Sequence, residues 1–115
     1  MGRRQRQREK LVAPTSEYRD EDGNVLALRG SLSPASRREY AAVLEGGRHR
    51  EDAWQRAVEF LFERLAVSWT ISGMPVERQR ELLARYRAAS GNERLFVRDS
   101  LREHVREHFP ELQAP

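Results

Sequence analysis

The chain has 115 residues and no cysteine, so we expect one domain without disulfides, thiolate metal sites or a cysteine nucleophile. Charged residues make up 34% of the chain and hydrophobic residues 38%, a balance that fits helices with one wet face. No apolar run is long enough to span a bilayer and no signal peptide is recognisable, so we expect no membrane association. The lack of cysteine also fits a reducing compartment.

The positive charge is concentrated at the N-terminus. Residues 1–10 hold five basic side chains against Glu9, which leaves 16 basic and 17 acidic residues for the rest of the chain. We therefore expect residues 1–16 to form a disordered basic arm ahead of a nearly neutral domain at 17–112, with a short tail at 113–115. The arm is either a solubilising or partner-ordered tail or a nucleic-acid arm. A nucleic-acid arm would use its basic residues: Arg3, Arg4, Arg6, Arg8 and Lys10.

Residues 17–30 are predicted to form a short β-hairpin. Tyr18 lies on the first strand and residues 25–28 lie on the second, while Asp22 and Gly23 carry the turn signal. The acidic residues around the turn invite a comparison with calcium loops. The ligand spacing and the closing glutamate of an EF-hand loop are missing, so a plain turn is expected.

The first predicted helix has clear start and stop signals. Ser33 is a capping residue, Pro34 suits the first helical position, and the glycine pair at 46–47 ends the helix. Tyr40 belongs to the face of this helix that we expect to point toward the core.

The richest apolar stretch runs from Asp52 to Trp69 and is predicted to be the central helix. Trp54, Val58 and Leu61 recur at helical spacing, and a widened stripe continues to the end of the stretch. So many aromatic residues indicate either core or a partner-binding surface, and the two roles can coexist in a dimer.

Two further helices are expected after Gly73, the first beginning at Pro75 and the second ending before Pro110. Residues 97, 101 and 105 form the inward column of the last helix, while arginine repeats at 94, 98, 102 and 106 beside an acidic column. That pairing indicates a solvated, ion-paired face more than a phosphate-binding ridge. The predicted fold class is therefore mainly α: about four helices with a short N-terminal hairpin.

His104 and His108 lie one helical turn apart, and the pentapeptide that they bound matches the inverted zinc-protease pattern H-x-x-E-H. Two histidines on one face can share a metal. However, little besides Glu111 follows as a third ligand, and no nucleophile elbow or phosphate loop accompanies the pattern. We therefore predict no metal, no cofactor and no enzymatic activity.

Four stretches together resemble a known family: residues 22–30, 53–69, 79–87 and 108–112. In element order and composition they are similar to the tail assembly chaperones, small and mostly helical proteins encoded by phages and prophages of high-GC bacteria. The use of 20 arginines against one lysine fits such a genome. The resemblance implies binding to a tape-measure or tail-tube subunit during virion assembly in the bacterial cytoplasm, often with self-association.

We accordingly expect a non-enzymatic protein-binding module with an apolar groove for a partner's amphipathic helix. The expected partner-binding anchors are four aromatic residues: Trp54, Phe62, Trp69 and Tyr86. The alternative is a small nucleic-acid-binding protein that uses the basic arm.

Overall fold

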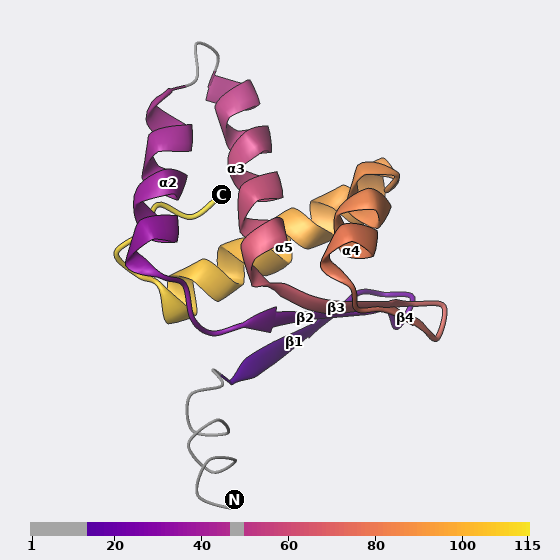
Figure 1. Cartoon of the computed structure of the whole chain (residues 1–115). Coiled ribbons are helices and arrows are strands. Elements are labelled where there is room, and N and C mark those ends of the chain that lie inside the picture. Colours follow the sequence, from indigo (N-terminus) through magenta and orange to yellow (C-terminus); the bar gives the residue numbers. More distant parts are fainter. Residues whose placement is uncertain (1–13, 47–49) are drawn as a thin grey trace, which may run out of the picture.

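The structure is a computed structural model that describes residues 14–46 and 50–115, in which helices cover one face of an antiparallel sheet (Figure 1). The elements are β1 (Thr15–Arg19), β2 (Val25–Arg29), α2 (Pro34–Glu45), α3 (Arg50–Leu65), β3 (Ala66–Ile71), β4 (Met74–Val76), α4 (Gln79–Arg87) and α5 (Gly91–His108). The predicted mainly α class is therefore wrong. The described residues form four helices and a four-stranded sheet, which is a mixed α/β fold.

The strands pair with their sequence neighbours in the order β1-β2-β3-β4, and every pair is antiparallel. The predicted N-terminal hairpin is present as β1 and β2. In its turn, the Asp20 carboxylate accepts hydrogen bonds from the backbone amides of Asp22 and Asn24, each at 2.9 Å. Gly23 has a φ of +80°, a conformation that glycine adopts without steric strain.

The central helix ends earlier than predicted. α3 stops at Leu65, and Trp69 belongs to β3. Leu65 and Trp69 are four residues apart, which fits a helical face, but Val67, Trp69 and Ile71 also alternate as one face of a strand. The strand prevails because β-branched residues favour it and because β2 offers a partner, with Leu26 directly opposite Trp69.

A second tight hairpin joins β3 to β4. Ser72 and Gly73 have φ values of 52° and 77°, as expected for a two-residue loop with two left-handed positions. Pro75 therefore lies in β4, at an edge of the sheet where its missing amide hydrogen is tolerated. The prediction that a helix begins at Pro75 is wrong, since α4 begins at Gln79.

The core lies between the sheet and the helices, which all stand on one side of it in Figure 1. The predicted inward column of α5 is confirmed, because Val97, Leu101 and Val105 are each 0% exposed. Tyr40 of α2 is also buried. α3 supplies the largest share of the core, with these buried residues: Ala53, Ala57, Val58, Leu61, Phe62 and Leu65.

Candidate functional site

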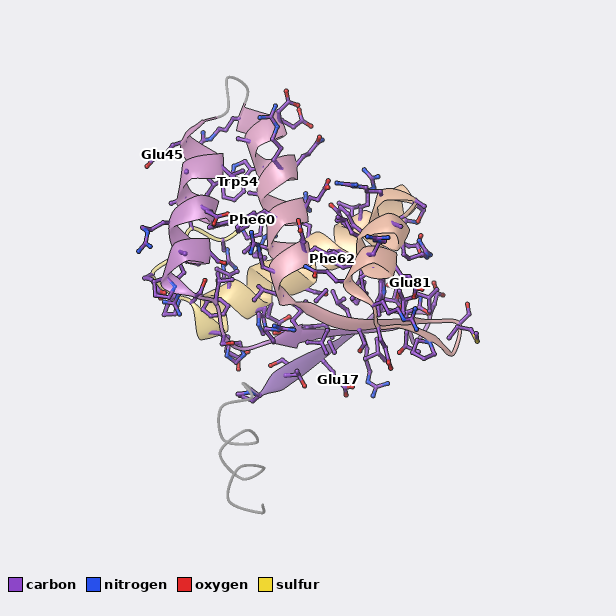
Figure 2. All side chains as sticks on the ribbon, in the orientation of Figure 1. Glu17, Glu45, Trp54, Phe60, Phe62 and Glu81 are labelled. Carbon is purple, nitrogen blue, oxygen red and sulfur yellow. The ribbon has the colours of Figure 1, made fainter. Side chains whose placement is uncertain are left out.

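Three of the four predicted anchors lie in the core. Phe62, Trp69 and Tyr86 are 0%, 1% and 7% exposed. The Phe62 ring stacks on Tyr86 with centroids 4.9 Å apart and meets Trp69 edge-on at 5.8 Å. Figure 2 shows Phe62 near the end of α3 that approaches the sheet. These rings hold α3, β3 and α4 together, and they leave little of their surface exposed.

Trp54 is the anchor that remains accessible. It is half-buried near the start of α3 (Figure 2) and lines a cleft of about 810 Å³ between α3 and α5. Val58 and Leu95 add apolar surface to this cleft, and Leu95 is 48% exposed. Tyr86 contributes from the end of α4. The cleft therefore combines an accessible aromatic ring with aliphatic side chains.

The two walls of the cleft carry opposite net charge. The charged lining residues are Glu51, Asp52, Arg56 and Glu59 on α3, and Arg94, Arg98 and Arg102 on α5. The α3 wall is acidic on balance, while the α5 wall is wholly basic. An elongated ligand in the cleft would meet positive charge along one side and mostly negative charge along the other.

An aromatic ring and main-chain oxygens hold two of the arginines in place. The Arg94 guanidinium lies over the Tyr86 ring, 5.5 Å from its centroid, and donates to the carbonyl oxygen of Arg87 at 2.7 Å. Arg102 donates from Nε to the main-chain oxygen of Pro115 at 2.6 Å. Because the Arg87 carbonyl carries no formal charge, this contact positions the Arg94 guanidinium without neutralising it.

A capping box stabilises the start of α5 beside the cleft. Ser90 and Glu93 form a capping box, in which each side chain accepts a hydrogen bond from the other residue's backbone amide. The hydrogen bond from the Ser90 amide lowers the pKa of the Glu93 carboxyl, and Arg85 of α4 also pairs with this group. Gly91 also lines the cleft, and a Cβ at this position would meet nothing within 4 Å.

The two histidines of the zinc-protease pattern connect α5 to the first hairpin. His104 Nε2 lies 2.8 Å from the carbonyl oxygen of Arg29, which can only accept, so Nε2 carries the hydrogen. His104 Nδ1 therefore accepts a hydrogen bond from the Tyr18 hydroxyl at 2.9 Å. His108 Nε2 lies 3.2 Å from the hydroxyl oxygen of Ser16.

This network leaves His104 without a nitrogen for a metal. Burial of His104, which is 0% exposed, lowers its pKa, and burial also raises the pKa of Tyr18 to about 12. Within residues 14–46 and 50–115, no three His, Asp or Glu side chains are grouped so that they could hold a metal ion. The arrangement is that of a structural contact.

The residues predicted for nucleic-acid binding, Arg3, Arg4, Arg6, Arg8 and Lys10, lie outside the described residues. The arginine row of α5 is described. Asp99 lies 3.4 Å from Arg98 and 3.9 Å from Arg102, so the acidic column partly compensates the row, as its spacing indicates.

No protein-family model, no curated protein and no solved structure matches this chain. In the described part of the chain, every helix is too short or too polar to cross a membrane.

Sequence reasoning misses Leu95 as a site residue. It lies outside the inward column at 97, 101 and 105 and follows Arg94 in the arginine row. A leucine on a charged helical face is the signal that could have identified it, because such a position is normally polar.

Proposed function

We propose that the protein is a non-enzymatic protein-binding module that receives one amphipathic helix of a partner protein in the cleft between α3 and α5. The observation that carries this proposal is the half-buried Trp54 beside the exposed Leu95 in a cleft of about 810 Å³. Helix-in-groove binding uses such apolar anchors spaced along a groove. Trp is also the residue type most often found to dominate binding energy at interfaces.

The charges of the walls define the partner. Its helix carries an apolar stripe for Trp54 and Leu95, acidic side chains toward Arg94 and Arg98, and basic side chains toward the acidic α3 wall. Opposite charges on the two walls favour one orientation of the bound helix, because a reversed helix would place like charges together.

We further propose that the module acts in phage tail assembly and that the partner is a tape-measure or tail-tube subunit. The support is the resemblance in element order and composition together with a small body that offers one cleft lined by Trp54. The four-stranded sheet departs from the mostly helical architecture that the resemblance implies. The cleft, and not the fold, therefore supports this assignment.

The test is binding of the purified full chain to purified tape-measure and tail-tube subunits, measured by calorimetry. Trp54→Ala is expected to weaken binding at least tenfold, since an anchor of this kind contributes roughly 2 kcal/mol or more. Phe60→Ala is the matched control: Phe60 is also a half-buried aromatic residue of α3 but lies outside the cleft lining (Figure 2). Equal effects of the two variants, or no binding by the wild type, would refute the proposal.

The nucleic-acid alternative is tested with the same protein. It predicts salt-dependent DNA binding that disappears when residues 1–10 are deleted, because five of the 21 basic residues lie there. The protein-binding proposal predicts that this deletion leaves the affinity for the protein partner unchanged.

A further inference from the structure

In the part of the chain that the structure describes, β1 forms one edge of the sheet. Among the described residues it pairs only with β2. The other edge, β4, is three residues long and contains Pro75, and both features discourage pairing with another strand. β1 has five residues and no proline. It is therefore the edge at which another strand can be added.

The hydrogen bonds of the first hairpin show which groups of β1 face outward. The Asp20 amide donates to Asn24 at 3.1 Å, and the Gly30 amide donates to Pro14 at 2.8 Å. Hydrogen-bonded pairs alternate along an antiparallel ladder, so the even-numbered residues of β1 bond to β2. The amides and carbonyls of residues 15, 17 and 19 consequently point away from the sheet and can bind a new strand.

The charged side chains of this edge can pair with those of the same edge in a second copy of the chain. Glu17 and Arg19 have 61% and 67% exposed side chains, lie on the same face of the strand and approach each other at 4.0 Å within one chain. We propose that β1 pairs antiparallel with β1 of a second copy about a two-fold axis, with Glu17 opposite the partner's Arg19. The symmetry forms this ion pair twice. The neighbouring register would place Glu17 against the partner's Glu17, which is unfavourable.

α5 lies where it can contribute to the same interface. Its histidines contact Tyr18 and Ser16 of β1, so the helix runs over the first hairpin. A two-fold axis at the β1 edge would place the two α5 helices antiparallel on the same side of the joined sheet. The exposed face of α5 carries both signs of charge in a shallow hollow lined by Asp99, Arg102, Glu103, Arg106 and Glu107. Glu103 can then approach the partner's Arg106.

The resulting dimer has a continuous eight-stranded sheet. It uses the edge of β1 and the charged face of α5 rather than the cleft beside Trp54, so it does not depend on the proposed function. In each protomer the cleft stays open to its own partner helix.

The test is sedimentation equilibrium of the full chain over a wide concentration range. The wild type is expected to dimerise, and Glu17→Arg and Arg19→Glu are each expected to raise the dimer Kd about tenfold or more, because two attractive pairs become repulsive. The double variant Glu17→Arg/Arg19→Glu is expected to restore the wild-type Kd. Glu81→Arg is the matched charge control, because Glu81 is exposed on α4 and lies away from β1 (Figure 2). It is expected to leave the dimer Kd unchanged.

Mixing the two single variants provides the sharpest readout. Glu17→Arg leaves two positive side chains on the β1 edge of one chain, and Arg19→Glu leaves two negative side chains at the same positions of the other. Each positive side chain would then face a negative one, so a heterodimer tighter than either homodimer is expected. A wild type that stays monomeric, single variants that dimerise like the wild type, or a double variant that remains monomeric would each overturn the proposal.

Discussion

The hydrogen bond between Tyr18 and His104 offers a direct test of how α5 is held to the first hairpin. Tyr18→Phe removes the hydroxyl that donates to His104 Nδ1 at 2.9 Å and keeps the ring, whose centroid lies 5.7 Å from the imidazole. His104 is 0% exposed, so its nitrogen would become a buried acceptor without a donor from the protein. Such a loss costs about 1–3 kcal/mol of unfolding free energy.

The loss of stability can be measured as a decrease in melting temperature. At roughly 2.1 cal/mol/K of unfolding entropy per residue, a chain of this length loses about 4 °C for each kcal/mol, so we expect a decrease of about 4–12 °C. Urea titration at pH 7.5 gives the free energy itself. Tyr86→Phe is the control, because it removes the same group from a buried ring whose hydroxyl bonds to no described residue. Equal losses for the two variants would refute the role of the hydrogen bond.

Two further predictions concern stability. Burial lowers the pKa of His104, so below the ordinary histidine pKa of about 6.5 the unfolded chain binds more protons than the folded one. The free energy of unfolding is therefore expected to fall by up to about 1.4 kcal/mol per pH unit on acidification. His104→Gln should flatten this pH dependence in urea titrations between pH 7.5 and 5. An unchanged slope in that variant would assign the acid sensitivity to other groups. Ser90→Ala removes the capping box of α5 and is expected to lower stability by about 0.5–2 kcal/mol in the same assay, whereas Ser90→Asp, which can still cap, should lose much less.

The candidate site could be predicted only in part. Aromatic density on the central stretch indicates either core or an interface, and the rings of Phe62, Trp69 and Tyr86 pack against one another across α3, β3 and α4. Which aromatic residue stays accessible depends on how the helices cross, and no residue spacing within one helix contains that information. Trp54 and Leu95 line one cleft between α3 and α5 although they lie 41 positions apart in the sequence.

The sequence by itself determined the features that arise from neighbouring residues: the turn at Gly23, the Ser33 cap of α2 and the buried column of α5. Each depends on a local conformational preference or on helical spacing. Only the tertiary structure decided that residues 66–76 form a hairpin and that His104 bonds to Tyr18. An apolar stretch that fits both a helix and a strand takes the form whose backbone groups find partners, and here β2 provides them from a distant part of the chain.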